Sequence, residues 1–490
     1  MWQKKQIGEY IKDSKMVQMG TLLVLCGVLG MGMTLMEGEL GTRGIYLWGS
    51  VIGVAILAVV IIFRCDEFIV GLLVAVHLYV DWYLALYVVG LGIALVLLLF
   101  FYLTRSARHP WVEPRAIWLW GLLLLLTFVP AIRGATNLYD AVYYYPNLIV
   151  GALAIFWIGT VTCRSSAALR RLYFIVTVIG VLVAMHTIIQ EITGTFLFAS
   201  SHYDAFLDSV SNYQIIGSDT HRVGSFFVDP NWDGTFLAMM LCLTLGLLGD
   251  CRSLQGKVFY LAEIALIGPA LLFTFSTGAL VGICAGVITF FLCVGQPLYR
   301  ILLPLLVTAM VIALVLLLPT HILLPIQHAS SPEEVLLRTG AWNTALRVIA
   351  AFPLTGVGLG LYAYLTSSEP YRVPAQTIPL AHPHNSYLEL AAMAGIPVLL
   401  VFIALLGFGL WSALCNWLVA DRRGRSLIAG GMAAVVALSV NSLSINGWTL
   451  PPLAATGWLI LGTIASPLLK KALGQLPNGE NSSTGSEELI

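Results

Sequence analysis

Residues 386–410 read SYLELAAMAGIPVLLVFIALLGFGL and contain a single charged residue, Glu389. A helix needs about 20 largely apolar residues to cross the hydrocarbon core of a bilayer, and this stretch supplies them. Similar apolar stretches recur along the chain between short polar segments. The pattern predicts an all-α polytopic membrane protein.

The composition supports the same fold class. Apolar residues make up 59% of the chain, charged residues only 10%, and the mean hydropathy is +0.89. A soluble domain carries about 25% charged residues, so this composition excludes an ordinary soluble protein. The first apolar stretch follows a basic head, lacks a small-residue cleavage site and precedes further spans, so we expect it to be retained rather than cleaved as a signal peptide.

The apolar stretches predict about 14 transmembrane helices. They lie at 16–36, 45–63, 68–80, 82–103, 116–132, 146–162, 172–190, 232–248, 258–275, 279–295, 301–318, 386–410, 426–441 and 451–467. The third stretch is short and can merge with the fourth, which leaves the helix count between 68 and 103 open.

Basic residues indicate the orientation, because they concentrate in cytoplasmic loops. With the amino terminus inside, the inner segments hold 19 of the 25 Lys and Arg residues, among them Lys470 and Lys471 near the carboxyl terminus. The remaining six are all arginines in outer segments: Arg43, Arg133, Arg222, Arg338, Arg347 and Arg372. We therefore expect both termini to be cytoplasmic.

This topology divides the chain into four parts. Residues 1–318 hold the first eleven spans with an outer segment at 191–231, 319–385 form a large outer loop, and 386–470 hold the last three spans. Residues 471–490 are rich in Asn, Ser, Gly and Glu and read as a disordered cytoplasmic tail.

The large outer loop contains a helix-like run at 332–352. Apolar residues recur there at roughly helical spacing: Val335, Trp342, Leu346 and Ile349. We expect an amphipathic helix that lies on the membrane surface, with Arg338, Trp342 and Ala345 sharing one side.

The cysteines and histidines predict no metal centre. On this topology all eight cysteines fall in spans or cytoplasmic segments, and no C-x-x-C pair occurs, so we expect neither disulfides nor a structural zinc. His382 and His384 are two residues apart, but no third ligand stands at a suitable spacing. The pair is either interfacial or catalytic, because a neutral imidazole is a suitable general base.

Two of the outer arginines lie among other polar residues in long segments. Arginine grips phosphate or carboxylate with a rigid two-pronged fork, and Arg222 and Arg338 are candidates for that use. Arg43 and Arg133 border short loops and are expected to anchor the membrane interface. Arg222 precedes Asp229-Pro230-Asn231, which either only starts the next helix or presents a helix amino terminus to an anion.

Three ordered motifs resemble the O-antigen ligase/polymerase superfamily. That family has His-Asn, nine residues and Gly-x-x-Gly, and here His384 and Asn385 are followed at that spacing by Gly395, with Val398 replacing the last glycine. The segment from Arg222 to Asn231 is similar to its Arg-x-x-Gly-x-Phe stretch leading to Pro-Asn.

The outer loop carries the third motif. Arg338 before an aromatic helix at Trp342, and the Pro-Leu-Thr-Gly-Val-Gly-Leu-Gly run at 353–360, look like the loop of that family. Its glycines lack the strand-to-helix setting of a nucleotide site, so we expect a backbone turn. One departure is Thr277, where the family often has the arginine of Ser-Arg-Gly, which puts that turn's role in donor binding in doubt.

The resemblance implies a C-type glycosyltransferase fold in the bacterial inner membrane, with no cofactor and no metal. The donor would be a glycan on undecaprenyl diphosphate, and the acceptor a glycan or glycolipid; no nucleic acid is expected. Arg222 and Arg338 would hold the diphosphate on the outer face, and His384 would deprotonate the acceptor with inversion at the anomeric carbon. Further contacts with substrate would come from Asn385, which would orient the imidazole or the acceptor, and from His382, Asp229, Asn231 and Trp342.

Two alternatives stay open. The acceptor separates a polymerase from a ligase, and nothing in the sequence identifies it. A transporter of an ion or of the lipid-linked sugar is the alternative from another class, but transporters usually carry internal repeats and deep ionisable residues. No repeat is evident, and the deep candidates are few: His77, Asp81, His186 and Glu263.

Overall fold

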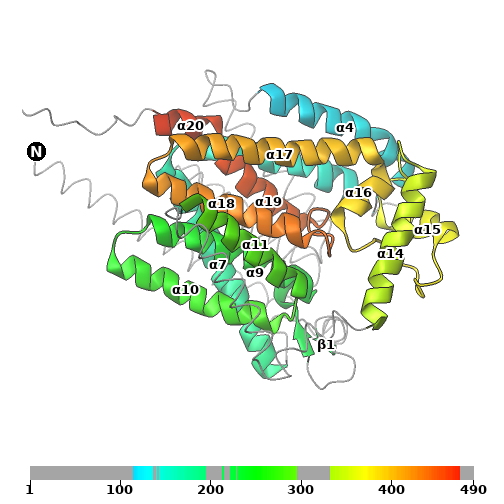
Figure 1. Cartoon of the computed structure of the whole chain (residues 1–490), viewed down its shortest axis with the longest axis horizontal. Coiled ribbons are helices and arrows are strands. Elements are labelled where there is room, and N and C mark those ends of the chain that lie inside the picture. Colours follow the sequence, from blue (N-terminus) through cyan, green and yellow to red (C-terminus); the bar gives the residue numbers. More distant parts are fainter. Residues whose placement is uncertain are drawn as a thin grey trace, which may run out of the picture. The chain divides into compact units, whose positions relative to one another are not determined.

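The computed structural model describes residues 114–135, 140, 143–194, 212–214, 221–227, 229–294 and 332–474. Apart from one two-stranded hairpin, these residues form helices and the turns between them (Figure 1). The spans predicted at 16–36, 45–63, 68–80, 82–103 and 301–318, much of the segment 191–231, and the chain after residue 474 lie outside the described residues.

In these ranges, eight helical segments are long and apolar enough to cross a membrane. They are α4 (Pro114–Gly134), α7 (Ser166–Thr193), α9 (Pro230–Asp250), α10 (Leu254–Phe273), α11 (Thr277–Val294), α17 (Ile396–Val419), α18 (Arg422–Asn441), and α19 (Pro451–Ile464) together with α20 (Pro467–Gly474). The helical membrane fold is confirmed, while the total of about 14 spans stays a prediction. Helix α20 also continues past residue 471, where we placed the start of the tail.

The span predicted at 386–410 begins later than expected. The chain first forms the short helix α16 (Ser386–Ala394), turns at Gly395 with a φ of 95°, and only then enters α17. A Cβ at Gly395 would overlap the backbone of Leu354, so this turn needs glycine both for its φ and for the close approach. The residues after the His384-Asn385 pair therefore form a helix of their own at the head of α17.

The span predicted at 146–162 is also divided. Its first part belongs to a π-helical stretch, η2 (Tyr143–Gly151), and its second part to α6 (Ala152–Thr162). Pro146 lies in η2 and lacks the backbone N–H that an α-helical ladder needs at this point. This segment packs beside α19, where Trp120 of α4 and Trp458 of α19 meet with ring centroids 4.9 Å apart.

Burial separates central from peripheral helices. In α9 and α18 78% of the apolar window is buried, and in the α19–α20 segment 89%, whereas α4, α10 and α11 are buried over only 22–28%. The exposed apolar side chains of the second group include Trp118 and Leu254. Exposed apolar surface of this kind marks contact with lipid or with other protein segments, and α4, α10 and α11 have the composition of lipid-facing helices.

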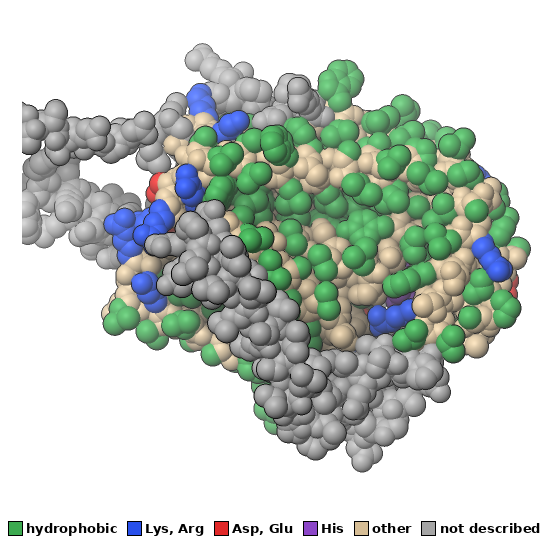
Figure 2. Space-filling model, in the orientation of Figure 1, with side chains coloured by type: hydrophobic (Ala, Val, Ile, Leu, Met, Phe, Trp, Pro, Cys, Tyr) green, Lys and Arg blue, Asp and Glu red, His purple; other side chains and the backbone are tan. Residues whose placement is uncertain are grey.

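The two ends of the helices differ in charge. At one end Arg170 of α7 forms an ion pair with Asp250 of α9, and Ser466 Oγ donates to Cys163 O at 3.1 Å. The basic residues next to these helix ends are Arg164, Arg170, Arg171, Arg252, Lys257, Arg422, Arg423, Arg425, Lys470 and Lys471. Figure 2 shows Lys and Arg side chains gathering around these ends of α10, α18 and α20, beside a broad hydrophobic surface. That this end is cytoplasmic stays a prediction.

The helix predicted at 332–352 is confirmed as α14 (Pro332–Ala351). Its buried face consists mostly of small residues: Ala341, Thr344 and Ala345 are each at most 2% exposed, beside Val348 at 0%, whereas Val335 and Leu346 are 42% and 51% exposed. Small side chains let α14 approach the protein closely, and two residues of the apolar stripe that we identified, Val335 and Leu346, point outward, whereas Trp342 and Ile349 are half-buried. Contact of this stripe with the membrane stays a prediction.

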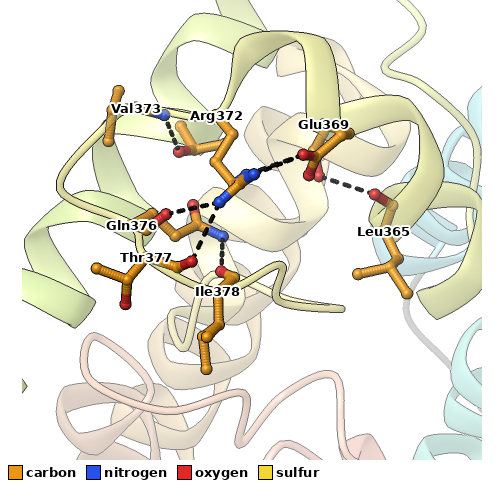
Figure 3. Close-up of polar contacts among 9 residues, drawn as sticks. Leu365, Glu369, Arg372, Val373, Gln376, Thr377 and Ile378 are labelled. Carbon is orange, nitrogen blue, oxygen red and sulfur yellow. Dashed lines mark hydrogen bonds and ion pairs between the residues drawn. The ribbon is translucent and has the colours of Figure 1, made fainter.

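A compact turn follows α15 (Leu361–Ser368) and the 3-10 helix η4 (Glu369–Tyr371). Figure 3 shows its organisation around Arg372, whose Nη2 donates to Glu369 Oε1 at 2.7 Å and whose Nη1 donates to the carbonyls of Gln376 and Thr377 at 3.1 and 3.2 Å. Val373 N donates to Thr344 Oγ1 at 3.2 Å. The turn is therefore closed on itself and attached to α14.

Candidate active site

His384 and His382 lie in the turn before α16. His384 has a φ of 50°, a left-handed conformation that residues other than glycine rarely adopt. Its backbone N–H donates to His382 Nδ1 at 3.3 Å, and the two rings meet edge to face with centroids 4.3 Å apart. Because His382 Nδ1 accepts this bond, the proton of a neutral His382 ring resides on Nε2.

His382 is a weak base. Burial, and secondarily the charge of a protonated His384, lower the pKa of His382 to about 3. A ring with this pKa stays neutral at physiological pH and accepts a proton only weakly. Of the two rings, His384 is therefore the better candidate for a general base, and His382 supports its backbone.

Asn385 connects the turn to two neighbouring segments. Its Oδ1 caps α16 by accepting the N–H groups of Tyr387 and Leu388 at 3.0 and 3.1 Å. Its Nδ2 donates to Leu443 O at 2.9 Å. Both ends of the carboxamide thus bond to backbone, which is the geometry of a helix N-cap; an additional contact with substrate stays a prediction.

Arg222 lies on the hairpin strand β2 (His221–Val223), which pairs antiparallel with β1 (Asn212–Gln214). The residue is only 8% exposed. Its Nε donates to Thr274 O at 3.1 Å and its Nη2 to Asn231 Oδ1 at 2.8 Å. These bonds hold the guanidinium between the end of α10 and the start of α9.

Asp229 and Asn231 have different places at this helix start. Asp229 is the N-cap of α9, and its Oδ1 accepts the N–H of Asn231 at 2.7 Å. The helix amino terminus is thus already capped by a carboxylate, which leaves anion recognition here to the guanidinium of Arg222. Asn231 is the residue that orients this guanidinium.

A buried polar cluster below Arg222 was not predicted as part of the site. Ser225, in the 3-10 turn η3 (Ser225–Phe227), has a φ of 47°. Its N–H donates to Gln190 Oε1 at 2.9 Å, and its Oγ lies 3.0 Å from His186 Nδ1. His186 was noted in the sequence as a deep polar residue for a transporter, whereas its described contact is with the turn that follows Arg222.

The turn Ser276-Thr277-Gly278 lies close to the same guanidinium. Thr274, whose carbonyl accepts from Arg222, is three residues before Thr277. A Cβ at Gly278 would overlap the side chains of Asn441 and Ser444. The Ser276-Thr277-Gly278 turn has Thr277 where the family often has an arginine. Arg222 of β2 nevertheless places a guanidinium beside this turn.

Arg338 and Trp342 lie on α14, and both are half-buried. Helix α14 packs against α16, so it lies beside the helix that follows His384. Trp342 Nε1 is buried and has no hydrogen-bond partner among the described residues. A buried indole N–H without a partner is a donor that a bound substrate can use.

The glycine run at 353–360 is a backbone turn, as predicted. Gly358 has a φ of 125°, its N–H donates to Met393 O at 2.9 Å, and a Cβ on it would lie within 3.0 Å of the Arg133 and Gly134 backbone. Arg133 Nη1 donates to Thr355 Oγ1 at 2.9 Å. Arg133, which we expected to anchor the interface, thus holds this turn.

The start of α15 is occupied by a carboxylate from another segment. Asp140 accepts the N–H groups of Leu361, Tyr362 and Ala363 at 3.0–3.2 Å. An anion from a substrate would have to displace it there. The arginines remain the better candidates for the diphosphate.

The segment 441–450, between α18 and α19, was missed as part of the site. Trp448 N donates to Ser386 Oγ at 3.0 Å, and Trp232 Nε1 donates to Asn446 Oδ1 at 3.0 Å. The segment therefore contacts both the α16 start and the α9 start. Its signal in the sequence was the polar run Asn-Ser-Leu-Ser-Ile-Asn at 441–446, which is unusual between two apolar spans.

Comparison with known families identifies part of the chain. Residues 264–403 match the O-antigen ligase family model. The matched range contains Arg338, Trp342 and His384, whereas Arg222 and Asn231 precede it. No curated protein matches the chain.

The family match covers two of the three motifs seen in the sequence, those of the outer loop and of His384, and the helical membrane fold agrees with it. The function is therefore of the glycan-transferring kind found in membrane ligases and polymerases. Residues 264–403 are thus similar to the O-antigen ligase family, which supports the superfamily that the sequence motifs indicate.

Proposed function

We propose that this protein transfers a glycan from an undecaprenyl-diphosphate-linked donor to a hydroxyl of an acceptor glycan or glycolipid, on the outer face of the bacterial inner membrane. The family match supports glycan transfer in a membrane. The diphosphate donor is what the resemblance to this family implies, and Arg222 and Arg338 are compatible with it, since a guanidinium fork suits phosphate oxygens.

In this proposal Arg222 and Arg338 hold the diphosphate. The buried position of Arg222 supports this role, because charge interactions are stronger away from water. Its bonds to Asn231 and Thr274 fix the plane of the fork before substrate arrives. Prepositioned cations of this kind stabilise charge that develops on a leaving group.

His384 is the general base. It takes the proton from the acceptor hydroxyl while that oxygen attacks the anomeric carbon. The bond between the anomeric carbon and the diphosphate oxygen breaks, and the diphosphate leaves with the electron pair. Attack opposite to the leaving group inverts the anomeric centre. The proton that is released moves to the imidazole, and the reaction needs no metal.

The observation that carries the proposal is the backbone of His384. A left-handed φ on a non-glycine residue is strained, and such strain concentrates at functional sites. It occurs here at the histidine of the family motif, next to a second histidine that is too weakly basic for the task.

The test compares His384→Gln with His382→Gln in purified protein, with lipid-linked glycan extracted from the host cells as donor. We expect His384→Gln to lower transfer about 10²–10⁴-fold, the usual effect of losing a general base, and His382→Gln to lower it only a few-fold. His384→Asn is the companion variant, because asparagine tolerates the left-handed backbone better than most residues. Binding of undecaprenyl diphosphate should persist in each. Near-normal turnover in both His384 variants would remove this residue from the mechanism.

The acceptor is determined in a deletion strain. Accumulation of single lipid-linked repeat units identifies a polymerase. Accumulation of long chains that never reach a second lipid identifies a ligase. Unchanged glycans would contradict both.

A further inference from the structure

The segment 441–450, termed here the bridging segment, is bound tightly to the start of α16. Ser386 N–H lies 3.0 Å from Ser442 O and 3.1 Å from Ile445 O, and Ser386 Oγ accepts the N–H of Trp448 at 3.0 Å. Thr449 Oγ1 lies 2.8 Å from Glu389 Oε2. The bridging segment therefore fixes the first turn of α16, directly after His384.

The same segment is bound to the start of α9. Trp232 Nε1 donates to Asn446 Oδ1 at 3.0 Å, and Asn441 Nδ2 donates to Thr235 Oγ1. Asn446 is only 6% exposed, and a hydrogen bond shielded from water is worth more than a surface one. The neighbour of Trp232 is Asn231, which orients the guanidinium of Arg222.

These contacts form a short, continuous connection between the two halves of the site. It runs from Arg222 through Asn231 and its neighbour Trp232 to Asn446. From Ile445, next to Asn446, it continues through Ser386 to the turn of His384. The Trp232–Asn446 bond joins side chains 214 positions apart in sequence. At this bond the start of α9 meets the segment between α18 and α19.

We propose that Trp232 and Asn446 are positioning residues, which set the distance and orientation between the anion-holding arginine and the general base. This inference rests on the proposed function. In the reaction, the base must reach the acceptor hydroxyl while the arginine holds the departing diphosphate. A misplacement of about 1 Å can lower turnover about 10²-fold, so a bond that fixes this separation affects turnover more than affinity.

The test removes the bond from each side. Trp232→Phe keeps an aromatic ring and deletes the N–H, and Asn446→Leu keeps the approximate size and deletes the acceptor oxygen. We expect each to lower turnover at saturating donor about 10–100-fold, with the Kd for undecaprenyl diphosphate changed less than about threefold. The turnover of the double variant should be no lower than that of the less active single variant, because the two substitutions remove the same bond. Asn446→Asp keeps an acceptor for the indole and should retain most of the activity.

A matched control separates positioning from simple stability. Asn416 of α17 is a buried amide at the opposite end of the helices, where its Nδ2 donates to Ile464 O at 2.7 Å and Ser466 O at 3.1 Å. Asn416→Leu should lower Tm at least as much as Asn446→Leu and leave turnover unchanged in the folded protein.

Three results would overturn the inference: normal turnover in Asn446→Leu, loss of donor binding in place of turnover, or an equal loss of turnover in Asn416→Leu. His384→Gln is measured in the same assay. If it retains transfer, the proposed function fails. If it loses transfer while Asn446→Leu does not, only the positioning role fails.

Discussion

Arg222 and Arg372, both predicted to lie on the outer face, each make several hydrogen bonds, yet these bonds connect different parts of the chain. Arg372 bonds to residues three to five positions away, and its side chain remains 31% exposed. Arg222 is 8% exposed and bonds to residues 9 and 52 positions away. Short-range bonds shape a loop, whereas long-range bonds place a cation where separate helices meet. Residue type and charge alone do not separate these two uses.

The contrast predicts that Arg222→Lys strongly lowers glycan transfer. Lysine keeps the charge but cannot bond to Asn231 and Thr274 while presenting a two-pronged fork to a diphosphate. We expect transfer to fall about 10²–10³-fold, the range seen when one prepositioned donor to a developing anion is lost. The measurement is the transfer rate of purified Arg222→Lys, with Arg372→Lys as the matched control. Equal activities of the two variants would show that Arg222 is only another structural arginine.

Arg338 is expected to follow Arg222 with a somewhat smaller effect, because it is half-buried on α14. Arg338→Lys should be nearly as damaging as Arg338→Ala, each lowering transfer about 10–100-fold. Titration of donor into the purified variants measures both affinity and turnover. Full activity of Arg338→Lys with loss of activity in Arg338→Ala would mean that a positive charge alone suffices. Two-pronged binding of the diphosphate by the guanidinium would then be wrong.

The sequence was informative where one local rule decides the structure. Apolar length predicted α7, α9 and α18, because burial of apolar surface dominates in membrane spans. Helical periodicity predicted the extent of α14 but not the face by which it packs. The Asp229-Pro230-Asn231 signature predicted a helix start, and the structure has Asp229 as the N-cap of α9.

The sequence failed where long-range contact decides. Gly395 ends a helix inside an apolar run because Leu354, 41 positions earlier, lies against it. The packed face of α14 includes Ala341, Thr344 and Ala345, because its partner segments come close, whereas periodicity alone favoured the larger residues Val335 and Leu346. The bridging segment was overlooked because Asn446 gains its meaning only from Trp232, which no local pattern connects to it.

The surroundings of His382 make its ring a weak base. Burial lowers the pKa of His382 from its ordinary 6.5 to about 3. Between these values an unfolded chain takes up a proton on His382 and the folded chain does not, so stability falls as the pH drops from about 6.5 towards 3. His382→Gln should flatten this loss in thermal unfolding measured across that range.

The pH dependence of transfer should not follow His382. Activity should decline on acidification because a protonated His384 cannot accept a proton, and His382→Gln should keep the same acid limb with a rate within about threefold of the parent. A displaced acid limb in His382→Gln would assign the titration to His382 and exchange the roles of the two rings.

The smallest effect is expected at Arg372. Its ion pair with Glu369 is exposed on both sides, 31% and 47%, and exposed pairs contribute only about 0.2–1 kcal/mol. Arg372→Lys also loses part of the bonding to the carbonyls of Gln376 and Thr377, so Tm should fall by a few degrees at most, on the order of 1 kcal/mol in total. Glu369→Gln keeps an oxygen that can accept the bond and should cost less still. Transfer should be unchanged in both, because the bonds of this arginine hold only its own turn and that turn's attachment to α14. A large loss of transfer in Arg372→Lys with normal Tm would mean that this turn contacts substrate, and local bonding would then be no guide to which outer arginines are functional.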